Sequence, residues 1–192
     1  MEVAFAGVPP ASRFAEVVFQ CPRASCQHLF LARYFDEYGY GSYRLVACLP
    51  RNLRGYALSA VVQEVSPSFC TIFDQAYQAE QMQLTQVCGP GYRKALEFLI
   101  KDYVSELNPD EEDQIKQMWL AACINKYVTD ANLKTTAERA VWLGNDETHY
   151  VKTWEDKDLE DLKKLIFLTV HWIEAERLTK ELLESMPGPS QK

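Results

Sequence analysis

Runs of β-branched and aromatic residues dominate the chain up to about residue 64. The runs "AEVVFQC", "HLFLARYF" and "SYRLVACLP" are separated by the turn-rich segments "PRAS" and "DEYGYGS", and this pattern predicts three antiparallel strands of a small sheet. Pro50 ends the last strand, because proline lacks the N–H that a strand ladder needs. The next segment, "ALSAVVQEV", fits either a short strand or a lead-in turn.

From residue 65 the spacing of apolar positions becomes helical. Ser66 before Pro67 is typical of a helix start, with serine as N-cap and proline at the first helical position. Apolar residues then recur at intervals of three and four in successive segments, which "CGPG" (88–91) and "NPDEEDQ" (108–114) separate. Three helices are predicted, the third carrying Ile115, Met118, Trp119, Ala122, Cys123 and Tyr127.

Two further helices are predicted after residue 130. A shorter one over "LKTTAERAVWL" ends at Gly144 and Asn145, and the longest runs from Leu159 to about Met186. Short connections favour antiparallel neighbours. We therefore expect an α+β protein with a small N-terminal antiparallel sheet (1–64), a helical bundle of four to five helices (65–187) and a frayed tail (188–192). The predicted inner face of the longest helix is Leu162, Leu165, Ile166, Thr169, Ile173, Leu178 and Leu182.

Composition narrows the functional class. The 192 residues are 47% hydrophobic, enough for a sizeable core. Twenty basic against 27 acidic residues give a net charge of -7, which argues against nonspecific nucleic-acid binding. The six cysteines are dispersed and are interpreted as reduced thiols. No stretch approaches the ~18 uninterrupted apolar residues of a membrane span or resembles a signal peptide. We expect a cytoplasmic protein with no membrane segment.

The segment "CPRASCQH" holds candidate zinc ligands. Cys21, Cys26 and His28, together with Cys48, would complete the four ligands that a tetrahedral zinc needs. Four residues separate the first two cysteines instead of the usual two, and Cys48 has no paired cysteine nearby. The alternative is a hairpin turn with ordinary cysteines. The incomplete ligand set favours this alternative. We therefore expect the protein to have no cofactor.

The basic pair Arg93 and Lys94 follows "CGPG" at an expected helix start. Free backbone N–H groups and two cations at such a start could hold an anion. The segment lacks the Lys-Ser or Lys-Thr ending of a phosphate-binding P-loop. A tight interhelical turn with exposed basic residues is the favoured alternative.

The stretch "RAVWLGNDETHY" (139–150) holds the most specific candidate chemistry. On a continuous helix Asn145 and His149 share a face. An imidazole that moves a proton, with a cation that stabilises a charged phosphorane-like transition state, could cleave RNA without metal. Arg139 is the candidate cation, although ten residues on a regular helix place it about 80° around the axis from His149. The alternative is a helix junction in which Gly144 ends a helix and His149 packs against a tryptophan, Trp142 or Trp154.

Two of these segments carry a family resemblance. "SPSFCTIFDQAYQAEQMQLTQVCGPGYRKALEFLIKDYV" together with "LGNDETH" resembles a bacterial and phage domain-of-unknown-function family related to the HEPN (higher eukaryotes and prokaryotes nucleotide-binding) helical superfamily. The resemblance covers roughly residues 64–185. It implies an up-and-down bundle of four to five helices, frequently dimeric, from a superfamily common in phage defence, toxin–antitoxin pairs and RNA cutting. Members often carry a short zinc-ribbon-like sheet before the helices, which matches the placement of Cys21 and Cys26.

Catalytic members of that superfamily share an arginine, often directly before an asparagine, followed by four to six residues and a histidine. Asn145 and His149 match this pattern, whereas Gly144 stands at the arginine position. We therefore expect a homodimeric, non-catalytic binding or regulatory module of phage–bacterium conflict that acts on a protein or nucleotide partner. Two alternatives stay open. One is a divergent metal-independent ribonuclease that uses His149 as acid or base, Asn145 to orient and Arg139, from either chain, as cation; the other is a zinc-dependent nucleic-acid adaptor.

Overall fold

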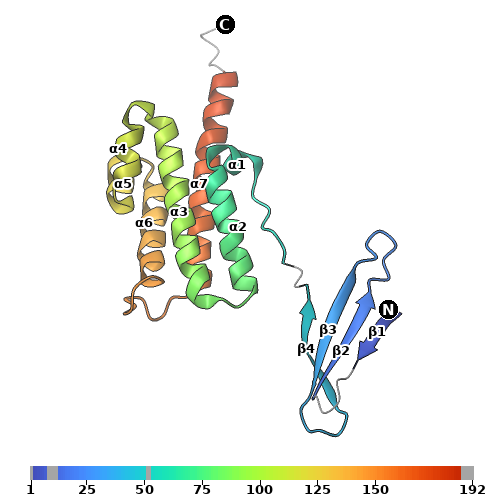
Figure 1. Cartoon of the computed structure of the whole chain (residues 1–192). Coiled ribbons are helices and arrows are strands. Elements are labelled where there is room, and N and C mark those ends of the chain that lie inside the picture. The colour runs from blue at the N-terminus through green and yellow to red at the C-terminus, as the bar shows by residue number, and fades with distance from the viewer. Residues whose placement is uncertain (1, 8–12, 51–52, 187–192) are drawn as a thin grey trace. The chain divides into compact units, whose positions relative to one another are not determined.

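The computed structural model describes residues 2–7, 13–50 and 53–186. The chain divides into two compact units between Leu53 and Arg54. An antiparallel sheet forms the first unit and helices form the second (Figure 1), so the predicted α+β layout is confirmed. The division falls earlier than the expected boundary after residue 64, because residues 60–65 form a helix that belongs to the second unit. The tail predicted at 188–192 lies outside the described residues.

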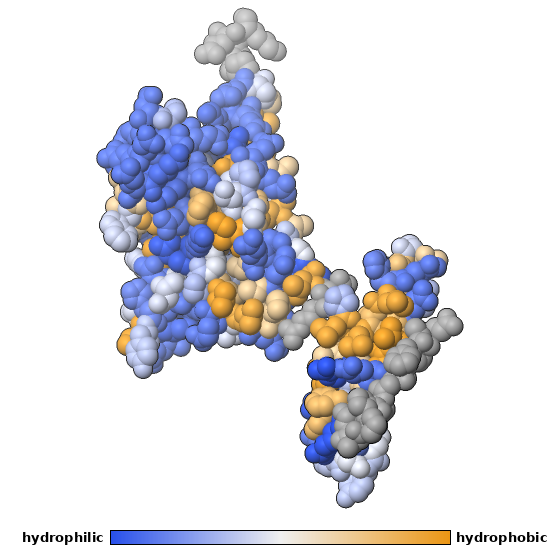
Figure 2. Space-filling view, viewed as in Figure 1, coloured by the Kyte–Doolittle hydropathy of each residue, from blue (hydrophilic) through white to orange (hydrophobic). Residues whose placement is uncertain are grey.

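The first unit is a four-stranded antiparallel meander. Its strands β1 (Glu2–Gly7), β2 (Phe14–Gln20), β3 (Leu29–Asp36) and β4 (Tyr43–Leu49) pair in chain order. The three predicted runs form β2, β3 and β4, and β1 adds a strand along the edge of β2. Asp36 orders the turn before β4, because its carboxylate accepts hydrogen bonds from the backbone N–H groups of Gly39 and Gly41, each with a positive φ. Figure 2 shows hydrophobic residues gathered across the visible face of this unit.

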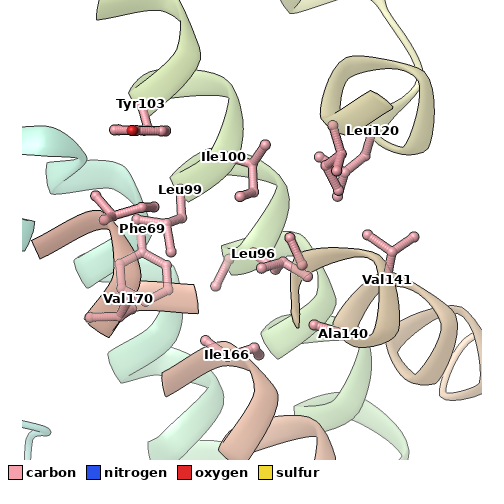
Figure 3. Packing of buried hydrophobic residues seen from close by; sticks show 14 of the residues in the cluster. Phe69, Leu96, Leu99, Ile100, Tyr103, Leu120, Ala140, Val141, Ile166 and Val170 are labelled. Carbon is pink, nitrogen blue, oxygen red and sulfur yellow. The ribbon is translucent and has the colours of Figure 1, made fainter. Parts of the chain in front are cut away.

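Four long helices account for most of the second unit: α2 (Pro67–Gln81), α3 (Thr85–Leu107), α6 (Ala131–Asp146) and α7 (Leu159–Ser185). The short helix α1 (Ala60–Val65) precedes them. A 3-10 turn (Pro109–Glu111), α4 (Glu112–Gln117) and α5 (Leu120–Tyr127) lie between α3 and α6. The side chains between these helices form one apolar core (Figure 3), which includes Phe69, Leu96, Leu99, Ile100, Ala140, Val141, Ile166 and Val170.

Side-chain caps fix where three of the four long helices begin, namely α2, α6 and α7. The Ser66 hydroxyl accepts from the N–H of Phe69, with Pro67 at the first helical position, as predicted. Asp130 caps α6 by accepting from the N–H of Leu133. Asp158 and Asp161 form a reciprocal capping box at the start of α7. Each cap satisfies backbone donors that would otherwise lack a partner.

Three predicted elements differ from the structure. "ALSAVVQEV" contains helix α1 rather than a strand or turn, because the side chains of Val62 and Val65 are buried in the core of the bundle. "CGPG" does not separate two helices, since α3 already begins at Thr85 and continues through Pro90. The single helix expected over 115–127 is two helices, α4 and α5, and Trp119 between them is 85% exposed rather than buried.

The longest helix matches its predicted bounds, but only part of its predicted inner face is buried. Leu162, Ile166 and Ile173 are fully buried. Leu178 and Leu182 are 47% and 60% exposed, because the C-terminal end of α7 projects beyond the neighbouring helices (Figure 1). The helical period therefore identified the correct side of α7, while the length of its partners limited how much of that side is covered.

Candidate functional site

The stretch 139–150 is a helix end, but the helix does not end at Gly144. Helix α6 continues to Asp146, so Gly144 and Asn145 are both helical. The chain then turns, and the nearly buried carboxylate of Asp146 accepts hydrogen bonds from the N–H groups of Thr153 and Trp154, at 2.9 and 2.7 Å. Asp146 thus holds the connection to α7 in place. Sequence reasoning missed this role, because the bonds span seven and eight positions, beyond any local turn pattern.

Gly144 is required by the close approach of Arg93 from α3. A Cβ atom at position 144 would lie 2.5 Å from Cδ and 3.0 Å from Cβ of Arg93. Only glycine leaves room for the arginine stem at this point. The predicted role of Gly144 as a helix terminator is therefore wrong, and its physical role is to admit a side chain from the neighbouring helix.

Arg93 uses this space to reach Asn145. Its Nε donates to Oδ1 of Asn145 at 3.0 Å, and Nη1 pairs with the Glu97 carboxylate at 3.3 Å. Burial raises the pKa of Glu97, but hydrogen bonding to Lys101 and the charges of Lys101 and Arg93 outweigh burial, so the pKa is lowered. Arg93 and Asn145 belong to separate candidate sites in the sequence, and the structure brings them together.

The anion site expected at Arg93 and Lys94 loses its geometric basis. Because α3 begins at Thr85, the backbone N–H groups of both residues lie inside the helix rather than at its start. Arg93 is largely buried in its ion pair with Glu97. Lys94 is exposed, with its ammonium 6.0 Å from the centre of the Phe98 ring. The two cations do not form the helix-start site that the sequence predicts.

Two tryptophans line both of two neighbouring cavities at the junction of α6 and α7. The indole rings of Trp142 and Trp154 stack nearly parallel, with centroids 6.3 Å apart and planes 8° from parallel. Both rings line a first cavity of about 370 Å³, whose other residues are Arg139, Leu143, Lys157, Asp161, Lys164 and Leu165. Both also line a second cavity of about 380 Å³, together with Asn145, Asp146, His149, Val151 and Thr153.

The candidate catalytic residues are divided between these cavities. His149 and Asn145 line the second cavity, and the backbone N–H of His149 donates to the backbone carbonyl of Asn145 at 3.1 Å. Arg139 lines the first, where its guanidinium lies 5.8 Å from the centre of the Trp142 ring and donates to the Thr135 carbonyl. His149 is exposed, and it lines the second cavity together with Trp142 and Trp154, the two tryptophans that the junction hypothesis names as its packing partners. The structure therefore keeps His149 with Asn145 and separates both from Arg139.

The candidate zinc ligands lie in the sheet unit. Cys21 and Cys26 flank the β2–β3 turn, where the Cys21 N–H donates to the His28 carbonyl at 2.9 Å. Hydrogen bonds from the backbone N–H of Arg23 and from Cys26 lower the pKa of the Cys21 thiol. Cys48 is exposed on β4. Across the described ranges, no group of three or more His, Cys, Asp or Glu side chains is placed to hold a metal ion, so these four candidates are not gathered into a site.

No helix in the described part of the chain is long and apolar enough to cross a membrane. Comparisons of the sequence with protein-family models and with curated proteins, and of the fold with solved structures, find no match.

Proposed function

We propose that the helical unit is a non-catalytic binding or regulatory module that acts on a nucleotide or protein partner. The observation that supports this most strongly is the division of Arg139 and His149 between two cavities, with the stacked Trp142 and Trp154 lining both. Metal-independent RNA cleavage needs the acid–base group and the stabilising cation at the same phosphate. A histidine without its cation lacks stabilisation worth about 100- to 1,000-fold in rate.

A divergent ribonuclease is the second candidate, and one contact favours it. Arg93 donates to Asn145, which lines the same cavity as His149. In this hypothesis Arg93, rather than Arg139, would supply the positive charge that is missing because Gly144 stands at the arginine position of the superfamily pattern. Its pairing with Glu97 opposes such a role, because the carboxylate already neutralises much of that charge. No contact in the described residues favours the zinc-dependent adaptor.

The cellular setting is proposed from the resemblance and the composition. A role in phage–bacterium conflict follows from the similarity to the HEPN superfamily, and a cytoplasmic location follows from the composition. A homodimer is proposed because the end of α7 carries exposed apolar side chains, namely Leu178, Leu182, Leu183 and Met186.

The catalytic question is tested by incubating purified protein with single-stranded RNA in the presence of a chelator. Wild type, His149→Ala and Arg93→Gln are compared with His171→Ala, which changes an exposed histidine of α7. We expect no cleavage above the buffer control in any sample. Cleavage by wild type that disappears in His149→Ala, with unchanged circular dichroism, would establish the ribonuclease instead. Its loss in Arg93→Gln as well would identify Arg93 as the cation.

A further inference from the structure

We propose that the first cavity, between the start of α7 and the Trp142 face of α6, binds a small planar aromatic anion of the nucleoside monophosphate type. This inference rests on the proposed binding role and specifies its ligand. It concerns the side of the tryptophan pair that Arg139 lines, not the side that Asn145 and His149 line.

The walls of the cavity suit a flat ring. Trp142 and Trp154 contribute aromatic surface to the lining, and Leu143 and Leu165 add aliphatic surface. Trp142 and Trp154 are 45% and 41% exposed as whole residues, so these large aromatic residues remain partly in contact with water. A planar base that stacks on an indole removes such area from water on both partners. The volume of about 370 Å³ falls within the roughly 300–1,000 Å³ of small-molecule sites, which matches one nucleotide.

The charge of the lining suits an anion. Arg139, Lys157 and Lys164 contribute positive charge to the lining and Asp161 contributes negative charge, although the whole chain carries a net charge of -7. Arg139 donates to a backbone carbonyl and lies over Trp142, and it has no carboxylate partner among the described residues. Its guanidinium is therefore available to bind a phosphate, with which arginine forms strong charge-assisted hydrogen bonds.

Among the described residues, the ion pairs of the two lysines are weak surface pairs. Lys157 lies 3.5 Å from Asp156, and Lys164 lies 3.4 Å from Asp161. Exposed pairs of this kind contribute little, so a phosphate could replace the carboxylates as partner.

The backbone that carries the two tryptophans is held in place before any ligand arrives. Asp146 holds the backbone of Trp154 through its N–H, and α6 carries Trp142 one turn before that aspartate. An ordered backbone reduces the ordering cost of binding. The cavity therefore combines aromatic surface on an ordered backbone with exchangeable positive charge, which is the arrangement that a base linked to a phosphate requires.

Isothermal titration with AMP, at low ionic strength, tests this assignment on the full chain. Adenosine and ribose 5-phosphate provide the base and the phosphate separately. We expect saturable binding of one AMP per chain, with each fragment at least about tenfold weaker, because stacking and phosphate contacts each contribute. Single-stranded oligoadenylate distinguishes a free nucleotide from one within RNA, and the size of the cavity predicts a gain of less than about tenfold over AMP.

Matched variants locate the binding. Trp142→Ala should weaken AMP binding about tenfold or more, and Arg139→Gln should weaken it about fivefold or more. Trp119→Ala removes an 85% exposed indole elsewhere, and Arg44→Gln removes an exposed arginine of the sheet unit; both should bind AMP as wild type does. Because Trp142 and Arg139 are exposed, both variants are expected to fold, and circular dichroism checks this.

Several outcomes would overturn the assignment. They are the absence of saturable AMP binding, binding that Trp142→Ala and Arg139→Gln leave unchanged, a fragment that binds as tightly as AMP, and oligoadenylate binding stronger than AMP by about tenfold or more. The RNA-cleavage assay is independent of all of them. Absence of AMP binding without RNA cleavage refutes the ligand alone, whereas histidine-dependent cleavage refutes the non-catalytic role.

Discussion

The substitution Gly144→Ala tests the packing at the heart of the candidate site. Glycine within a helix is usually less stable than alanine by roughly 0.5–1 kcal/mol, so this change normally stabilises a protein. Here the new methyl group would meet the stem of Arg93, at 2.5 Å from Cδ and 3.0 Å from Cβ. The Cβ atom of Arg93 cannot move without its backbone, so a rotation of the side chain relieves only part of the overlap. We therefore expect Gly144→Ala to destabilise the helical unit.

The magnitude follows from three contributions. Overpacking a filled site costs about 1–3 kcal/mol. Displacing Arg93 from Asn145 costs about 1.5–3 kcal/mol if that hydrogen bond is lost completely, and the gain in helix propensity returns about 0.5–1 kcal/mol. Because the clash is relieved either by strain or by loss of the bond, and the propensity gain is subtracted, the net loss should be about 0–2.5 kcal/mol, centred on about 1.3 kcal/mol. At about 2–4 °C per kcal/mol for a chain of this size, the melting temperature should fall by several degrees.

The assay is chemical unfolding followed by far-ultraviolet circular dichroism, which reports mainly on the helices. The same substitution in an Arg93→Ala background is the decisive control, since the obstructing atoms beyond Cβ are then absent. There only the 3.0 Å approach to Cβ of residue 93 remains, so Gly144→Ala should be less destabilising than in the Arg93 background by about 1 kcal/mol or more. A Gly144→Ala protein that is more stable than wild type, or that shows the same change in both backgrounds, would refute the packing argument.

Three further predictions concern charge, metal and assembly. Glu97→Gln should destabilise the chain at neutral pH, because the pKa of Glu97 is lowered in the folded state. The ionised carboxylate therefore contributes to the free energy of unfolding above the ordinary glutamate pKa of about 4.3, and this contribution is lost as pH falls through the folded-state pKa. The difference from wild type in urea unfolding should thus shrink below about pH 4, and a constant difference would contradict it. Metal analysis of protein purified without chelator should give well under one zinc per chain, and a stoichiometric zinc that Cys21→Ser removes would show the sheet to be a metal site. Light scattering at micromolar concentration should report about twice the 22.0 kDa chain mass; a single-chain mass would exclude the dimer.

The period of the apolar residues predicted much of the fold. Three strands and the long helices follow from it, and Ser66 with Pro67 marks a helix start that the structure confirms. "CGPG" misled the prediction, because glycine and proline usually break helices. In the structure these glycines serve contacts between helices instead. A Cβ at position 91 would lie 2.9 Å from Cβ of Ala76, and one at position 89 would overlap the Glu147 side chain.

The candidate site was predicted only where its residues are close in sequence. Asn145 and His149 are near neighbours on the chain, and they share a cavity. Arg93 and Asn145 are 52 positions apart, so no spacing rule connects them. The exposure of Trp119 was missed for a related reason: periodicity shows which residues share a face, but the length and position of neighbouring helices decide whether that face is covered.

The central claim is that the first cavity, which Arg139 lines, binds its ligand without acid–base chemistry from His149. A crystal structure of the chain with AMP tests this most directly. The account predicts adenine against Trp142 or Trp154 and the phosphate bonded to Arg139 or Lys164, with the His149 ring outside hydrogen-bond distance of the phosphate. A phosphate contacted by His149 together with Arg93 or Arg139 would contradict the account, because it would place a proton-transfer group and a stabilising cation at the same reacting centre.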